Sequence, residues 1–158
     1  MMRMIGPALA AVTVLTMSAA VAQNAAQNVA QNLTVIKERQ DHLEAMGKAV
    51  KEPVKMFKGD AEFDLAKVQA ALKVIQAKAA LLPALFPEDS KVGEDTEALA
   101  AIWDNKADVQ SRFKKLGEDA KKAEAAITDE GSFQTEFKEV MGNCGGCHKK
   151  YRKEKEKS

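Results

Sequence analysis

The sequence predicts an all-α protein that folds as an antiparallel four-helix bundle. In four separate segments, apolar residues recur at intervals of three and four, which is the spacing of one buried stripe along an amphipathic helix. Aromatic residues make up only 5% of the chain, and no segment has the composition or pattern of a strand. The connections between the segments are short, which favours antiparallel neighbours in a bundle.

The first two helices are predicted over residues 33–57 and 65–82. Pro53 should kink or end the first, because its ring removes a backbone donor and crowds the preceding turn. Gly59 then follows in a turn, and the second helix stops at Pro83. The apolar stripes are Leu33, Ile36, Leu43, Met46, Val50, Val54 and Phe57 in the first helix, and Leu65, Val68, Leu72, Ile75, Ala79 and Leu82 in the second.

The last two helices are predicted after a loop that runs from Pro83 to about Asp95. Asp95 or Thr96 could cap the third helix and Ser132 the fourth, because short polar side chains accept hydrogen bonds from the free amides of a first turn. The stripes are Leu99, Ile102, Trp103, Val109, Phe113, Leu116, Ala120, Ala123 and Ile127 in the third helix, and Phe133, Phe137, Val140, Cys144, Cys147 and Tyr151 in the fourth.

The run Cys144-Gly145-Gly146-Cys147-His148 holds the only two cysteines of the chain. In an exported protein, such a run is the covalent attachment site of a c-type haem. Residues three apart lie side by side on a helix, so both thiols can face the vinyl groups of one porphyrin while His148 turns toward the iron. We therefore expect one haem c near the C-terminal helix, attached at Cys144 and Cys147, with His148 as the axial ligand.

Two other uses of these cysteines fit the sequence less well than haem attachment. Thiol–disulfide exchange is expected near a βαβ pattern, and no segment here is typical of a strand. A structural zinc ion needs four ligands, and beyond Cys144, Cys147 and His148 the chain offers only His42.

The N-terminal segment predicts export. Residues 1–22 hold a basic Arg3, an apolar stretch and a small-residue site at Ala20–Ala22, which is the pattern of a secretory signal peptide. We expect cleavage there, a periplasmic location and no membrane span afterwards, with an uncleaved tether as the alternative. Residues 23–32 repeat Ala-Gln-Asn and are expected to form a low-complexity tail, which leaves residues 33–158 as the bundle domain.

Charge excludes some partners. Cleavage removes one of the 24 basic residues and none of the 23 acidic ones, so the mature chain is formally neutral, which argues against nucleic acid or anionic lipid. Basic residues gather at the C-terminal end. They suit a solvated helix terminus through the helix dipole, or a docking patch for an acidic redox partner.

These features together resemble the cytochrome c′ family. Besides the signal peptide, the helical pattern and the C-terminal Cys-x-x-Cys-His run, residues 33–153 share several of its local patterns. They are Arg39 four residues before Leu43, Lys58-Gly59, Leu85-Phe86-Pro87, Ala101-Ile102-Trp103 and Tyr151-Arg152.

The resemblance implies a pentacoordinate, high-spin haem with His148 on the proximal side. Leu43 would lie over an open distal site, where low-spin relatives place a Met, and would also pack in the core. Arg39 would pair a haem propionate or be solvated. Arg152, one turn after His148, would lie beside the proximal pocket, bonding a propionate, tuning His148 or holding a diatomic gas, or else be a surface residue. The family also implies a homodimer that pairs through the first two helices.

Other residues are assigned by position alone. Met46, three residues past Leu43, is the candidate hidden thioether ligand, and Trp103 is expected to be a buried packing residue near the haem. Met56 and Met141 are expected to fill the core. His42 should point away from Leu43, toward solvent or a partner.

Two functions follow from this set. The first is a haem protein that binds nitric oxide or carbon monoxide behind an apolar gate. The second is a low-spin electron carrier with His and Met ligands and a redox partner protein. An enzyme is not expected, because no acid or base is placed on the distal side.

Overall fold

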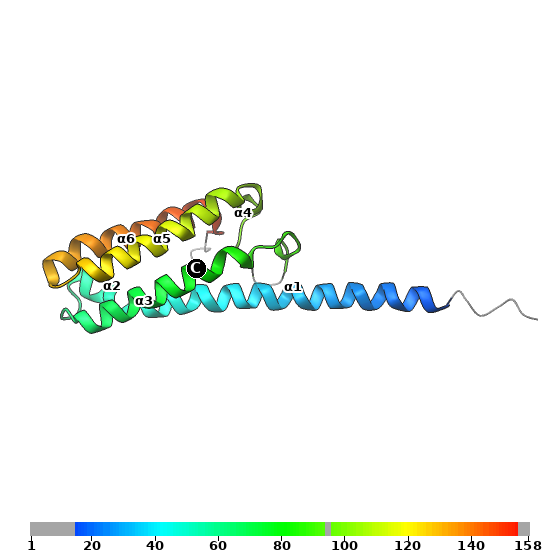
Figure 1. Cartoon of the computed structure of the whole chain (residues 1–158), viewed down its shortest axis with the longest axis horizontal. Helices are drawn as coiled ribbons and strands as arrows, with labels where there is room; N and C mark the ends of the chain where they lie inside the picture. Colours follow the sequence, from blue (N-terminus) through cyan, green and yellow to red (C-terminus); the bar gives the residue numbers. More distant parts are fainter. Residues whose placement is uncertain (1–14, 94–95, 155–158) are drawn as a thin grey trace, which may run out of the picture.

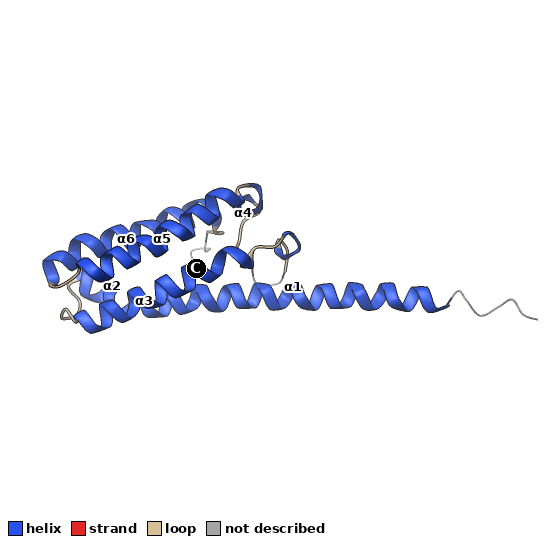
Figure 2. Ribbon diagram, viewed as in Figure 1, coloured by secondary structure: helices blue, strands red, loops and turns tan. Residues whose placement is uncertain are grey.

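The computed structural model describes residues 15–93 and 96–154, which form a helical bundle (Figures 1 and 2). Two long helices lie side by side at one side, α1 (Leu15–Ala49) and α3 (Leu65–Leu81), and α5 (Lys106–Ala126) and α6 (Glu130–Tyr151) lie side by side at the other. Four short helices connect them: α2 (Lys51–Lys58), η1 (Leu82–Leu85), η2 (Glu88–Ser90) and α4 (Ala101–Asp104). Within the described residues no strand forms, only an isolated bridge between Ala98 and Arg152. The all-α bundle is confirmed.

The first predicted helix differs from expectation at both ends. It begins at Leu15, so helix runs through the segment expected to be a tail; residues 1–14 of the expected signal peptide lie outside the described residues. It breaks at Val50, and α2 follows. Pro53, the third residue of α2, has no N–H to donate to Ala49, which explains the break. Gly59 closes α2 with a φ of 80°, the left-handed conformation that glycine adopts without strain.

The third predicted helix is two helices, which corrects the expectation. It breaks at Asn105, whose side chain donates to the Ala101 carbonyl at 2.9 Å. Leu99 lies before α4 and donates its N–H to the Tyr151 carbonyl at 3.0 Å. This bond to α6 keeps the stretch before α4 from being helical.

Two predicted caps are wrong and one lies outside the described residues. Thr96 caps no helix, because its hydroxyl accepts from the Arg39 guanidinium at 3.1 Å; Asp95 lies outside the described residues. Helix α6 is capped by Asp129, which accepts from the Ser132 N–H at 2.8 Å, and Ser132 accepts from the Asp129 N–H in return. The two residues form a capping box.

The buried apolar side chains form two clusters. The larger core joins α2, α3, α5 and α6, and has Leu72, Phe133 and Phe137 at 0% exposure. The smaller core lies at the other end and includes Leu82, Phe86, Trp103 and Tyr151. The stretch Leu65–Leu85 is long and apolar enough to cross a membrane by length and composition. Part of this stretch is buried in the larger core, where Val68, Leu72 and Ile75 are at most 1% exposed, while Leu82 packs in the smaller core and Leu81 is 51% exposed.

Candidate haem-binding site

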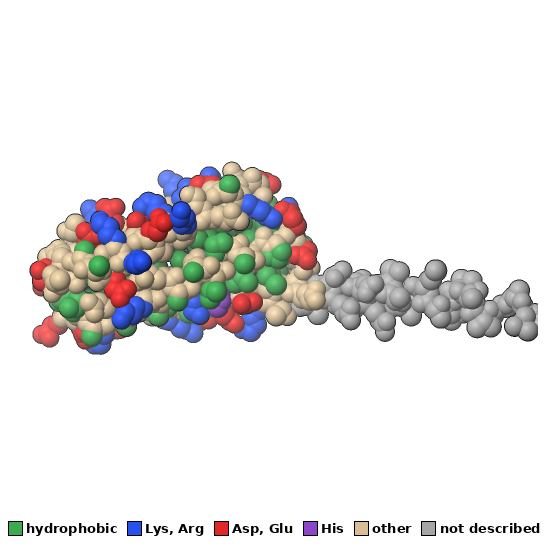
Figure 3. Space-filling model, viewed as in Figure 1, with side chains coloured by type: hydrophobic (Ala, Val, Ile, Leu, Met, Phe, Trp, Pro, Cys, Tyr) green, Lys and Arg blue, Asp and Glu red, His purple; other side chains and the backbone are tan. Residues whose placement is uncertain are grey.

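A cavity of about 600 Å³ lies between the two cores. Figure 3 shows hydrophobic side chains gathered between the α1–α3 pair and the α5–α6 pair, with charged side chains around them. The cavity brings together seven residues singled out from the sequence: Arg39, Leu43, Met46, Cys144, Cys147, His148 and Arg152. Trp103 does not line it. Trp103 is 6% exposed and donates its indole N–H to the Pro87 carbonyl at 2.7 Å, so it packs the neighbouring core.

The two cysteines and His148 lie on the cavity side of the last two turns of α6. Cys144 packs against the larger core and Cys147 against the smaller, and both are free thiols. Burial raises the pKa of each thiol. Partial burial of the His148 ring lowers its pKa, and Arg152 lowers it further. A neutral imidazole keeps a nitrogen lone pair available to a metal.

The α1 wall of the cavity is built by Leu43 and Met46, one turn apart. Leu43 lines the cavity at 39% exposure and belongs to neither core cluster. Met46 is half-buried and packs against both cores. A leucine offers no lone pair to a metal, whereas a methionine thioether does.

Arg39 is buried at 2% exposure, which corrects the expectation of a solvated side chain. Its guanidinium donates to the Leu85 carbonyl at 3.0 Å, the Ser90 hydroxyl at 3.1 Å and the Thr96 hydroxyl at 3.1 Å. It also lies 4.7 Å from the centre of the Phe86 ring. Burial lowers the pKa of this group. In this structure Arg39 holds the loop after α3 onto α1.

Two of the C-terminal basic residues, Arg152 and Lys153, are tied to the bundle, so the expectation of a freely solvated end is wrong for these two; Lys155 and Lys157 lie outside the described residues. Arg152 lies 3.8 Å from Glu97, and its backbone bridges to Ala98. The Lys153 N–H donates to the Glu97 carbonyl at 2.8 Å. This connection closes the His148 end of the cavity.

Sequence reasoning missed Asp108 and Arg112 on α5. One oxygen of Asp108 accepts from the Tyr151 hydroxyl, from Arg112 Nε at 2.9 Å and from Lys150 Nζ at 3.0 Å. These three donors hold the pKa of the carboxyl well below its usual value. The available signal was the four-residue spacing of Asp108 and Arg112, which is common on solvated helix faces and so points to no site.

The remaining candidates from the sequence, Met56, Met141 and His42, lie in different surroundings. Met56, at 3% exposure, fills the larger core as predicted. Met141 lines the cavity as well as packing against that core. His42, expected to point away from Leu43 toward solvent or a partner, does not line the cavity; 16% of its side chain is exposed and its Nε2 lies 3.8 Å from Glu38.

The residues at the cavity fit a haem. The walls are mostly apolar, and two thiols three residues apart lie beside an imidazole on one helix. Within residues 15–93 and 96–154, no group of three His, Cys, Asp or Glu could hold a bare metal ion. Cys144 and Cys147 would hold the macrocycle and His148 the iron, which supplies a site for electron exchange or for a small ligand.

Comparison with known proteins agrees with a haem site. The family model of cytochrome c′ matches residues 34–152. The chain belongs to the cytochrome c′ family. A cytochrome c′ of Rhodopseudomonas palustris is 45% identical over 121 residues, which cover 77% of this chain and 83% of the relative. This chain is therefore a c-type cytochrome, an electron-transport protein with haem c as its cofactor.

Solved structures of the family share the bundle. The structure of cytochrome c′ from Rhodopseudomonas palustris matches with a TM-score of 0.75 at 45% identity, covering 77% of this chain and 97% of that one. A ferrous variant of cytochrome c prime from Alcaligenes xylosoxidans, described with bound NO, matches with a TM-score of 0.68 at 26% identity, covering 78% and 97%.

Proposed function

We propose that this cytochrome carries a pentacoordinate, high-spin haem that binds small uncharged gases such as nitric oxide or carbon monoxide. The observation that carries the proposal is Leu43 on the α1 wall of the cavity, because a leucine side chain offers no lone pair to the iron. The bound NO in the relative from Alcaligenes xylosoxidans supports the same ligand class. The proposed role is binding rather than catalysis, as expected from the sequence.

The proposed anchors are Cys144 and Cys147 for the thioether bonds and His148 for the axial bond. Both thiols border the cavity, and His148 follows on the same helix. Replacing either cysteine by Ala should leave only one thioether, and replacing both should yield a chain without covalent haem. Mass spectrometry of the denatured protein measures this directly. A haem that stays attached to the double variant would contradict the assignment.

Optical spectra of the ferric and ferrous protein, with and without carbon monoxide, test the gas-binding function. High-spin bands that shift when the gas is added are expected. Sharp low-spin bands that do not respond would contradict an open site, because they require a second strong axial ligand.

Met46 supports a second candidate, a low-spin electron carrier with His148 and Met46 as ligands. Its thioether borders the same cavity and lies between the two cores. Met46→Leu distinguishes the two functions. The variant should keep the spectrum of the unmodified protein if the haem is pentacoordinate, and should turn a low-spin spectrum high-spin if Met46 is a ligand. Met56→Leu, a change in the larger core, is the matched control.

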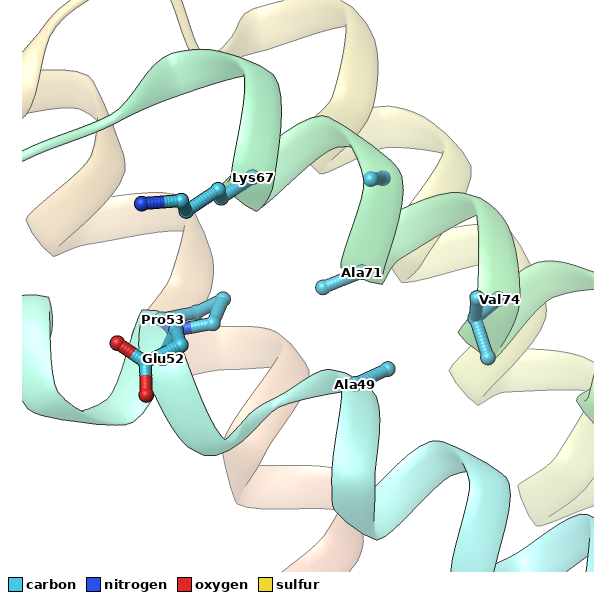
Figure 4. A pocket seen from close by; sticks show the side chains of 7 residues that line it. Ala49, Glu52, Pro53, Lys67, Ala71 and Val74 are labelled. Atoms are coloured by element: carbon cyan, nitrogen blue, oxygen red, sulfur yellow. The ribbon is translucent and has the colours of Figure 1, made fainter.

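We also propose a periplasmic homodimer that pairs through α1, α2 and α3. A groove of about 310 Å³ between these helices is lined by Ala49, Pro53, Ala70, Ala71 and Val74, with Glu52 and Lys67 at one end (Figure 4). Small side chains allow the close approach of a second helix pair. Val74→Glu should shift the molecular mass measured by light scattering from two chains to one. A dimer that persists in this variant would place the interface elsewhere.

A further inference from the structure

Three side chains from α5 and α6 meet on one carboxylate oxygen beside the cavity. Asp108, in the first turn of α5, accepts there from Tyr151, Arg112 and Lys150. Tyr151 and Lys150 belong to the last turn of α6. The bonds therefore connect the beginning of one helix with the end of the other.

The same side chains line the site. Arg112 and Tyr151 border the cavity together with His148. The Arg112 guanidinium lies 5.8 Å from the centre of the Tyr151 ring, and a Cβ built on Gly146 would lie 3.7 Å from Arg112 Nη1. Arg112 thus reaches the turn between the two cysteines, within van der Waals distance of position 146.

Tyr151 is fixed at two points. Its hydroxyl donates to Asp108, and its carbonyl accepts from the Leu99 N–H at 3.0 Å. The residue is 3% exposed, so its ring is also packed. His148 precedes it by three residues and shares the turn, because the Arg152 N–H donates to the His148 carbonyl at 3.1 Å. Fixing Tyr151 therefore fixes the direction in which His148 projects.

We infer that Asp108, Arg112 and Tyr151 form a clamp that positions the His148 turn of α6 and so sets the orientation of the axial imidazole. The clamp acts through the helix turn and touches no iron ligand itself. In metalloproteins, residues outside the set of metal ligands commonly orient a ligand and thereby tune the metal. The clamp would act on His148 in the same way. The inference rests on the proposed role of His148, and on no statement about gas binding.

Two mild variants of the haem-loaded full chain test the clamp. Tyr151→Phe removes one hydroxyl and keeps the ring, and Asp108→Asn keeps the size of the side chain. In both, the iron–histidine stretching band of the ferrous protein in resonance Raman spectra should broaden and move, because the freed turn lets the imidazole take several orientations. The reduction potential of Tyr151→Phe should also shift, although no charge changes at neutral pH. The double variant should change the band by less than the sum of the two single changes.

Glu136→Gln is the matched control. It breaks the Glu136–Lys122 pair, another contact between α5 and α6, at 3.1 Å, and neither residue lines the cavity. Its band should match that of the unmodified protein. The clamp is overturned if Tyr151→Phe leaves band and potential unchanged, or if the control changes them equally. If Asp108→Asn does not accumulate with haem, Tyr151→Phe still decides. Absence of the band in the unmodified protein would overturn the proposed five-coordinate haem but not the ligand, and the reduction potential of Tyr151→Phe would then decide the clamp, whereas a normal band that ignores Tyr151→Phe would overturn the clamp alone.

Discussion

The larger core and the cavity end are held together by different interactions. In the larger core, helices meet through apolar side chains that are completely buried, and the rings of Phe133 and Phe137 lie 5.0 Å apart. Around the cavity, the neighbouring elements are joined by directional bonds: Arg39 to the loop after α3, Asp108 to the end of α6, and Arg152 to Ala98.

The difference follows from the cavity itself. Apolar burial is non-directional and stabilises in proportion to the area removed from water, so it can close a solid core. It cannot hold walls apart around an internal space. Hydrogen bonds from Arg39 and Asp108 fix wall positions without filling the cavity, so we expect stability to depend most on the larger core and the geometry of the site most on the polar bonds.

The largest effect is expected from Phe137→Ala. The side chain is 0% exposed and contacts the rings of Phe57 and Phe133. Its loss should lower the free energy of unfolding by about 3–5 kcal/mol, measured by denaturant titration. Leu81→Ala, at a site 51% exposed, is the control and should change stability by less than about 0.5 kcal/mol. Equal losses in the two variants would contradict the assignment of the main core.

Arg39→Met should have the next largest effect and a different signature. The change leaves the Leu85 carbonyl and the Ser90 and Thr96 hydroxyls without their donor, which should cost about 3 kcal/mol. Hydrogen exchange should accelerate in the loop, beginning at the Ser90 amide that donates to Pro87, while amides of the larger core keep their relative protection. Lys37→Met, on an exposed face of α1, serves as control. If protection from hydrogen exchange were lost evenly over all helices, Arg39 would not be a local anchor.

The helices and the attachment run could be predicted because their signals are local. A stripe of apolar residues depends on spacing within one helix, and Cys144, Cys147 and His148 lie within five consecutive residues. The stripe also placed both cysteines on the buried side, where the cavity lies.

The errors concern contacts between distant residues. Arg39 binds partners 46 to 57 residues away, and no pattern near Arg39 shows that a loop will cover it. The break at Asn105 follows a stretch held by Tyr151, more than 40 residues later. The prediction of the α6 cap was wrong for a local reason. Asp129 and Ser132 are both good cap residues, and only the geometry shows that Asp129 is the cap.

Gly93→Ala should have a smaller effect on stability, at the place where the loop after η2 approaches α1. A Cβ on Gly93 would lie 2.4 Å from Ile36 Cδ1, and Ile36 is 2% exposed. Because this atom is the end of a side chain that can shift, the loss should be about 1 kcal/mol. Ile36→Val removes that methyl group. The double variant should therefore lose less stability than the sum of the two single variants, and strict additivity in denaturant titrations would show that the two residues do not meet.

The smallest expected effect is the acid dependence of the Asp108 bonds. The pKa of Asp108 is lowered in the folded protein, first by the Tyr151 hydroxyl and then by Arg112 and Lys150, from an ordinary value of 3.8. A carboxyl with a depressed folded pKa stabilises above its unfolded pKa, and this contribution is lost as the pH falls below it. Stability of the unmodified protein should therefore fall more steeply between about pH 4 and pH 2 than that of Asp108→Asn.

The comparison variant for this acid effect is Asp129→Asn, because the pKa of Asp129 is also lowered, by the Ser132 amide at the far end of α6. Both variants should flatten the dependence of the unfolding free energy on pH. Only Asp108→Asn should also change the iron–histidine band at neutral pH, since only Asp108 bonds the turn that carries His148. A band that changes equally in both variants would place the control of the site outside the clamp, and the polar bonds at the cavity end would then stabilise in the same general way as the apolar contacts of the larger core.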